Sequence, residues 1–293
     1  MKKPTFLRTT LAVALTGGLM FGSMQASAAY VQTTLNFSQS SGFNTSLMTS
    51  TDPATPANDI RWYESPLGVT PLAGTFDTIA WGVPSINNGG LMANDPFDVT
   101  GGVSDVFSGL RVLGWSGNVT TGADLGVWGG WEAVSTVYHQ NSTISSSAFT
   151  LQTATIASVL TISSYNDPLH NIPIGFTETL NNVSLPAQCP AGAPNDSICD
   201  DLFTFQLTDF APISFSVGGK YYEARFGLGA FNNSSTNFPG CNGGPTCTVW
   251  TAEGVTSDMS VLMSIRQVPE PATLALVGAA LLGLGAMRRR KEV

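Results

Sequence analysis

Apolar and polar side chains alternate along several short stretches of this 293-residue chain. In "DLFTFQLTDF" the alternation places Phe203, Phe205 and Leu207 on one face and polar residues on the other. The stretch "DMSVLMSIR" alternates in the same way, and its apolar face consists of Met259, Val261, Met263 and Ile265. A period of two residues is typical of a strand with one buried face. Both stretches therefore predict β-strands.

A glycine pair, Gly218-Gly219, interrupts another alternating stretch, "PISFSVGGKYYEARFGLG". Two residues are enough for the tightest hairpin turns, and glycine readily adopts the positive φ that such turns require. The stretch predicts a β-hairpin whose apolar face consists of Ile213, Phe215, Val217, Tyr222, Ala224, Phe226 and Leu228.

The rest of the chain between Ala29 and Gln267 is also free of helical periodicity. The sequence contains 31 glycines and 17 prolines, which supply frequent turns between short strands. The expected fold of residues 29–267 is therefore all-β, a β-sandwich of jelly-roll-like type.

The first 28 residues have the composition of a secretory signal peptide. Lys2 and Lys3 precede an apolar stretch from about Leu11 to Phe21, and small residues lead up to Ala28. Cleavage is expected after Ala28. The apolar stretch is too short for a first transmembrane helix.

The last 26 residues, 268–293, do not read as part of the sandwich. Residues 272–287 are uncharged and are followed by Arg288, Arg289, Arg290 and Lys291. A helix rises about 1.5 Å per residue, so these 16 residues span about 24 Å of a hydrocarbon core about 30 Å thick. We predict one transmembrane helix over about 272–288, with the basic residues on the cytoplasmic side.

The tail "VPEPATLALVGAALLGLGAMRRRKEV" resembles a PEP-CTERM sorting signal. The resemblance rests on three parts in order: a Pro-Glu-Pro triplet, a short apolar helix and an arginine-rich end. The matching residues are Pro269, Glu270, Pro271, Arg288, Arg289 and Arg290. It implies processing near the triplet by an exosortase-type membrane protease in a Gram-negative bacterium. The protein would then be transiently single-pass in the inner membrane and finally reach the cell surface or the extracellular space, often alongside extracellular polysaccharide.

Charge is distributed unevenly between the ends and the middle of the chain. Between Ala29 and Val268 there are five basic and 18 acidic residues, a net charge of about −13. Such a surface repels phosphate backbones, so nucleic acid is not an expected partner. The acidity is typical of a soluble exported domain.

Four cysteines lie in the last third of the chain: Cys189, Cys199, Cys241 and Cys247. Four cysteines allow three pairings. The simplest closes two local loops, Cys189 with Cys199 and Cys241 with Cys247, as expected in an oxidising compartment. Zinc is the rival interpretation, but the spacings do not match a zinc site. We expect no metal ion and no cofactor.

The stretch "STVYHQNSTI" contains His139-x-Asn141, which resembles the signature of the THxN family of PEP-CTERM proteins. Three other stretches support the resemblance: "TIAWGVP", "FTETLNN" and "CDDLFTF". Tyr138 departs from the pattern, because the family name calls for threonine there. The resemblance implies an exported β-rich domain without an established catalytic activity.

Two pairs of residues are candidates for ligand contact. His139 and Asn141 are two residues apart and share one face of a strand. They either contact a ligand or a carbohydrate hydroxyl, or form a buried hydrogen-bonded pair that fixes a loop or an adjacent strand. Trp128 and Trp131 flank a glycine pair, and they either stack on sugar rings or pack in the core.

Two further chemistries are weakly indicated. A Ser-His-Asp hydrolase lacks a Gly-x-Ser-x-Gly elbow, since Ser116 has no second spacer before the next glycine. Hard oxygen ligands for calcium gather near the first cysteine pair, but they also suit an acidic turn. These ligands are Asn195, Asp196, Asp200 and Asp201.

The sequence therefore predicts an exported surface or matrix protein with a non-catalytic structural or interaction role and no catalytic residue. The alternatives are a carbohydrate-binding module for extracellular polysaccharide and, third, a secreted hydrolase.

Overall fold

The computed structural model describes residues 30–51, 60–64, 72–82, 90–91, 97, 107–142, 144, 148–179, 189, 194–195, 199–230, 232–236 and 244–269. Within these ranges the elements are strands, apart from two short 3-10 helices, η1 (Thr45–Leu47) and η4 (Leu207–Phe210). None of the described helices is long and apolar enough to span a membrane. The predicted signal peptide and the predicted transmembrane helix lie outside the described residues.

The first sheet, sheet A, has nine strands. In spatial order its main path is β15 (Ser234–Thr236), β16 (Thr246–Thr251), β12 (Asp201–Gln206), β11 (His170–Thr177), β9 (Leu151–Ile162), β1 (Thr34–Phe43) and β7 (Ser116–Thr120). Two short strands, β2 (Thr49–Ser50) and β10 (Tyr165–Asn166), also pair with β9. Every pairing in sheet A is antiparallel.

The second sheet, sheet B, has eight strands. In spatial order they are β13 (Ile213–Val217), β14 (Lys220–Ala230), β17 (Thr256–Val268), β8 (Glu132–Gln140), β6 (Ser108–Gly114), β4 (Thr78–Trp81), β3 (Arg61–Tyr63) and β5 (Gly90–Leu91). The pairing is antiparallel, except between β3 and β5.

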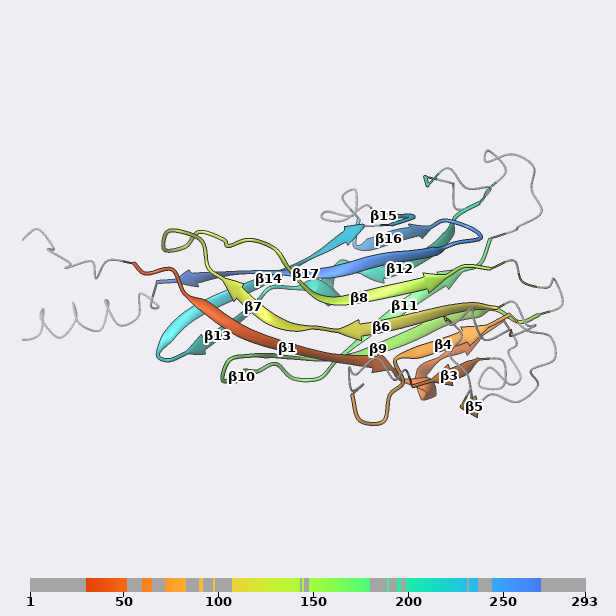
Figure 1. Ribbon diagram of the computed structural model, residues 1–293, viewed down its shortest axis with the longest axis horizontal. Coiled ribbons are helices and arrows are strands. Elements are labelled where there is room, and N and C mark those ends of the chain that lie inside the picture. Colours follow the sequence, from red (N-terminus) through yellow and green to blue (C-terminus); the bar gives the residue numbers. More distant parts are fainter. Residues whose placement is uncertain are drawn as a thin grey trace, which may run out of the picture. The chain divides into compact units, whose positions relative to one another are not determined.

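Sheets A and B pack face to face as a β-sandwich (Figure 1). One core cluster joins Phe43 and Ile156 of sheet A to Leu110 of sheet B. A second cluster joins Ile162 of sheet A to Ile265 of sheet B. Alternate residues of each strand face this shared interior, because the side-chain period of a strand is two. The predicted β-sandwich is confirmed, while its jelly-roll-like topology stays a prediction.

The glycine pair forms the predicted hairpin between β13 and β14. Val217 pairs with Lys220, so Gly218 and Gly219 are the two turn residues. Both have positive φ, 58° and 78°, as a two-residue hairpin turn requires. The hairpin prediction is confirmed.

One predicted strand ends earlier than its alternation suggests. Phe203 and Phe205 face the core, but β12 ends at Gln206 and Leu207 opens the 3-10 helix η4. Leu207 is 36% exposed. The prediction that Leu207 shares the buried face was therefore wrong. The Asp209 carboxylate accepts a hydrogen bond from the Gln206 N–H, which favours the turn over a longer strand.

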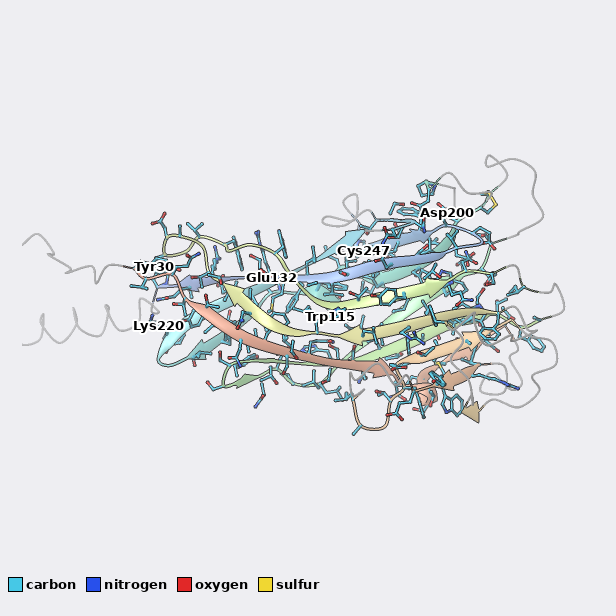
Figure 2. All side chains as sticks on the ribbon, in the orientation of Figure 1. Tyr30, Trp115, Glu132, Asp200, Lys220 and Cys247 are labelled. Carbon is cyan, nitrogen blue, oxygen red and sulfur yellow. A yellow bond between two sulfur atoms is a disulfide. The ribbon has the colours of Figure 1, made fainter. Side chains whose placement is uncertain are left out.

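The two ends of the sandwich differ in the residues that they contain. At one end, Val268 of β17 pairs with Tyr221 beside the hairpin turn, and β1 begins nearby (Figure 1). The labels of Lys220 and Asp200 in Figure 2 mark this end and the opposite one. The opposite end contains a group of buried polar side chains.

Candidate functional site

A buried polar cluster lies between the sheets at the Asp200 end of the sandwich. It is formed by Trp81, His139, Glu178, Thr179, Asp201 and Thr251. The strand pairing explains how these positions meet. Asp201 and Thr251 are direct neighbours on β12 and β16 of sheet A, and His139 lies on β8 of sheet B.

His139 is enclosed by aromatic side chains and is only 2% exposed. Its ring stacks on Trp81 with a centroid separation of 5.9 Å, and the rings of Phe203 and Phe176 approach edge-on at 4.9 and 5.7 Å. Nδ1 forms a hydrogen bond with Thr251 Oγ1 at 2.8 Å. Burial lowers the pKa of His139 from 6.5 to about 3, because an imidazolium is costly away from water. His139 is therefore neutral at physiological pH.

Asp201 faces His139 from the other sheet and is fully buried. Its Oδ1 accepts hydrogen bonds from the Thr179 N–H at 2.9 Å and the Thr179 hydroxyl at 3.0 Å. Burial is the main cause that raises the pKa of Asp201 to about 9, and the nearby Glu178 charge adds to it. Asp201 is therefore a protonated, neutral acid at pH 7. Its contact with His139 is a polar contact between neutral groups and not an ion pair.

Glu178 follows β11 and completes the acidic side of the cluster. The Trp81 indole N–H donates a hydrogen bond to Glu178 Oε2 at 3.2 Å. Burial raises the pKa of Glu178 to about 7; the Trp81 hydrogen bond opposes this shift, and the Glu253 charge adds to it. Glu178 thus titrates near neutral pH, at a lower pH than Asp201.

Several buried atoms of this region lack a hydrogen-bond partner among the described residues. They include His139 Nε2, Asp201 Oδ2, Glu178 Oε1 and both amide atoms of Asn141. Orphaned buried polar atoms are uncommon in folded proteins. The described His, Cys, Asp and Glu side chains form no group suited to hold a metal ion. The arrangement couples the two sheets through polar contacts at a site closed to solvent.

The two predicted ligand-contact pairs are not brought together. His139 pairs with Ser257 of β17, whereas Gly129, between Trp128 and Trp131, donates its N–H to Ile265 O of the same strand at 2.9 Å. These two points are eight residues apart along β17, about 26 Å at about 3.3 Å per residue. His139 and Asn141 are both buried, with Asn141 1% exposed. Their burial fits a buried pair better than a ligand contact, but only His139 has a side-chain hydrogen bond, to Thr251, and the Asn141 amide has none among the described residues.

Trp128 and Trp131 form a ladder with two arginines on the outer face of sheet B. The Arg225 guanidinium lies 4.5 Å from the Trp128 ring centre and 4.7 Å from that of Trp131. Arg266 lies 4.6 Å from the Trp128 ring centre and is paired with Glu223, with Nε to Oε2 at 2.8 Å. These cation–π contacts attach the loop between β7 and β8, which carries both tryptophans, to β14 and β17. We call these five residues the Trp-Arg ladder.

The acidic residues near the first cysteine pair have separate structural roles. Asp200 Oδ2 accepts hydrogen bonds from Asn195 N at 2.9 Å and Asn195 Nδ2 at 3.1 Å, which close the turn. Asp201 belongs to the buried polar cluster instead. Asp196 lies outside the described residues. Asn195 and Asp200 fit the acidic-turn interpretation, whereas Asp201 is not part of the turn.

The predicted cysteine pairing is confirmed for one bridge. Cys189 and Cys199 are disulfide-bonded, with Cα atoms 5.3 Å apart. Cys247 is also disulfide-bonded, and its predicted partner Cys241 lies outside the described residues.

A model of the PEP-CTERM protein-sorting motif matches residues 267–291. The chain carries the PEP-CTERM sorting motif. No curated protein and no solved structure matches the chain. The PEP-CTERM match begins at Gln267 inside β17, so the sorting signal starts where the sandwich ends. Pro269, the first residue of the triplet, is exposed, and Glu270, Pro271 and Arg288 to Arg290 lie outside the described residues.

The finer resemblance to the THxN family of PEP-CTERM proteins stays a prediction. The four stretches that suggest it do converge, because each supplies residues to the buried polar cluster or to its aromatic walls. Tyr138, the departing residue, precedes the inward-facing His139 on β8, so strand alternation directs it to the outer face. The departure therefore leaves the buried cluster unchanged.

Strand alternation and residue spacing do not identify Glu178, Thr179 and Thr251 as members of a site. The signal available for the first two was their place in "FTETLNN", one of the supporting stretches. Arg225 and Arg266 were also missed, although they are two of only five cations in the body of the chain.

Proposed function

We propose that this protein is exported, sorted by an exosortase-type membrane protease and delivered to the cell surface or extracellular matrix of a Gram-negative bacterium. There the β-sandwich has a non-catalytic structural or interaction role. The PEP-CTERM motif at residues 267–291 is the observation that carries this proposal. In this proposal, residues 1–28 direct export and the helix over about 272–288 holds the precursor in the inner membrane until it is cut.

The position of the motif suits removal of the tail. β17 is held to its end, because Val268 pairs with Tyr221 and the Gly126 N–H donates to Gln267 O at 2.8 Å. The exposed Pro269 follows directly. Cleavage near the triplet would leave every described strand in place. The Cys189–Cys199 bridge also fits an oxidising compartment outside the cytoplasm.

The chemistry of the buried polar cluster supports a non-catalytic role. A general base must reach its substrate and titrate near the operating pH. His139 is 2% exposed and has a pKa of about 3, so it suits neither requirement. This argues against the secreted hydrolase, which was the third candidate.

A carbohydrate-binding role is the second candidate function, and the Trp-Arg ladder favours it. Trp131 is 44% exposed and lies beside the Arg225 guanidinium. An exposed aromatic ring next to a cation suits a sugar that carries a carboxylate better than a neutral sugar. The ladder thus favours a polysaccharide whose carboxylates reach Arg225 locally, although the body as a whole carries a net charge of about −13.

The carbohydrate candidate is tested by binding of alginate and of dextran to the protein. Saturable binding of alginate that is lost in Trp131→Ala supports it. The matched control is Trp115→Ala, which removes another half-exposed tryptophan, 41% exposed at the turn between β6 and β7. Equal binding by both variants, or no binding at all, would reject this role.

The sorting proposal is tested by fractionating cells that produce the wild type or Pro269→Ala/Glu270→Ala/Pro271→Ala. We expect the wild type at the cell surface and the triplet variant in the inner membrane. Pro168→Ala/Pro212→Ala serves as the control, because it replaces two exposed prolines of the body. If the triplet variant reaches the surface as the wild type does, the proposal is wrong.

A further inference from the structure

A cavity of about 120 Å³ lies between the two sheets, near the middle of the sandwich. Its wall on sheet A includes Ile156 of β9 and Ile174 of β11, and its wall on sheet B includes Val137 of β8 and Val261 of β17. The lining is predominantly aliphatic and aromatic. The cavity is separate from the buried polar cluster, since no member of the cluster lines it.

Partial exposure of core residues is a second sign of this space. Val137, Ile172, Ile174, Met259 and Val261 all pack against the core cluster, yet each remains only partly buried. Protein interiors are normally packed as densely as organic crystals, so residues at such positions are usually closed off. Here the interior stays accessible from one side.

The opening results from the way the chain leaves sheet A. The pairing of β12 with β11 extends only to Gly175, and η4 then carries the chain across to β13 of sheet B. The first residues of β11 therefore have β9 as a neighbour but no β12 on the other side. His170, which is 49% exposed, lines the cavity at this edge. The cavity thus reaches solvent between the start of β11 and η4.

Most polar groups around the cavity already have partners within the protein. Gln39 Nε2 donates to Ser158 Oγ at 2.9 Å, and His170 Nε2 pairs with Asp167 Oδ2 at 2.9 Å. Asp209 Oδ2 accepts a hydrogen bond from Gln206 N at 3.1 Å. Gln39 Oε1 lacks a partner among the described residues. A ligand would thus gain apolar contact and few hydrogen bonds.

We propose that this cavity is a binding site for a small apolar molecule of the size of one aromatic ring or a short alkyl chain. A cavity of about 150 Å³ with an aliphatic and aromatic lining stays dry and takes up benzene, so the volume here suits a ligand of that class. A sugar is excluded, because its hydroxyls would be buried without partners. The site is independent of sorting and of the Trp-Arg ladder.

Fluorobenzene is the probe that tests this site, followed by ¹⁹F NMR. The full-length chain is used in detergent, and the contribution of the micelles is the same for every variant. Val137→Phe places a ring in the cavity, whereas Val255→Phe makes the same change at a turn position that is 40% exposed. Ala211→Trp at the cavity edge serves as a second blocking variant, should Val137→Phe not fold.

We expect saturable binding of fluorobenzene by the wild type and by Val255→Phe, with a rise in Tm for both. The affinity should fall at least tenfold in Val137→Phe and in Ala211→Trp. A response that does not saturate overturns the proposal. Equal affinity in the wild type and in a folded blocking variant overturns it as well.

Discussion

His139 and Asp201 face each other across the interior of the sandwich, with Nε2 and Oδ2 3.9 Å apart and both groups neutral. His139 comes from sheet B and Asp201 from sheet A. The contact therefore links the two layers without a net charge in the core. Because both pKa values are displaced by burial, the cluster makes folding stability depend on pH in two opposite ways.

Asp201→Asn should flatten the fall in stability between pH 4 and pH 9. The folded pKa of Asp201, about 9, exceeds its ordinary value of 3.8. Between these values the unfolded chain loses the proton and the folded chain keeps it, so the free energy of unfolding falls as pH rises, by up to about 1.4 kcal/mol per pH unit. Asparagine does not titrate. Urea unfolding at pH 5 and pH 8 measures the difference.

We expect Asp201→Asn to be more stable than the wild type at pH 8 and to retain a shallower slope up to about pH 7, where Glu178 titrates. Asp124→Asn, at an exposed position, is the control and should keep the full slope. A wild-type slope in Asp201→Asn would show that Asp201 is ionised in the folded protein.

His139→Phe should remove an opposite dependence at acidic pH. The folded pKa of His139, about 3, is below 6.5, so only the unfolded chain binds a proton between these values. Stability contributed by the neutral ring is present above pH 6.5 and is lost as pH falls toward 3. Phenylalanine keeps the ring packing but does not titrate. Between pH 4 and pH 7 the free energy of unfolding of His139→Phe should therefore rise more steeply on acidification than that of the wild type, in which His139 offsets part of the opposite dependence of Asp201 and Glu178.

His139→Ala should lower the free energy of unfolding at pH 7 by about 3 kcal/mol, because it leaves a cavity between the Trp81, Phe176 and Phe203 rings. His170→Ala removes the other histidine of the chain, which is 49% exposed, and should change stability by less than about 1 kcal/mol. Equal losses in the two variants would contradict the enclosed position of His139.

Arg225→Ala should destabilise the protein by about 1–2 kcal/mol. Its guanidinium contacts the Trp128 and Trp131 rings, and cation–π contacts contribute on this scale when partly desolvated. Lys220→Ala removes a cation at the exposed hairpin turn and should have little effect. Thermal unfolding compares the two. If both variants have the same Tm as the wild type, the Trp-Arg ladder does not contribute to stability.

Cys189→Ser/Cys199→Ser should cost about 2–3 kcal/mol of stability. The bridge spans ten positions along the chain, and closing a loop of this length restricts the unfolded state by about that amount. Urea unfolding without reductant provides the measurement. A loss well below 1 kcal/mol would mean that the loop is constrained without its bridge.

Much of the fold could be predicted from local patterns. The Gly218-Gly219 hairpin and the apolar face of β17 follow from alternation and turn chemistry, which act over a few residues. Leu207 was misplaced because alternation continues past Gln206, whereas the Asp209 side chain ends the strand. A hydrophobic pattern contains no information about a side-chain hydrogen bond that competes with a longer strand.

The site was only partly predictable. His139 and Asn141 were singled out, but their burial depends on which strands lie opposite. Glu178 lies near Asp201 because the paired strands β11 and β12 end and begin there. The spacing of the two residues along the sequence does not indicate that they are neighbours. The cavity is a gap in packing between two sheets, and alternation predicts only which side chains face inward.

The intact mass of the protein recovered from the cell surface is the most direct measurement of the sorting proposal. The predicted chain begins near Ala29 and ends close to the Pro269–Pro271 triplet, without the apolar and arginine-rich remainder of the motif. A surface-exposed chain that still ends at Val293 would contradict processing at the sorting motif.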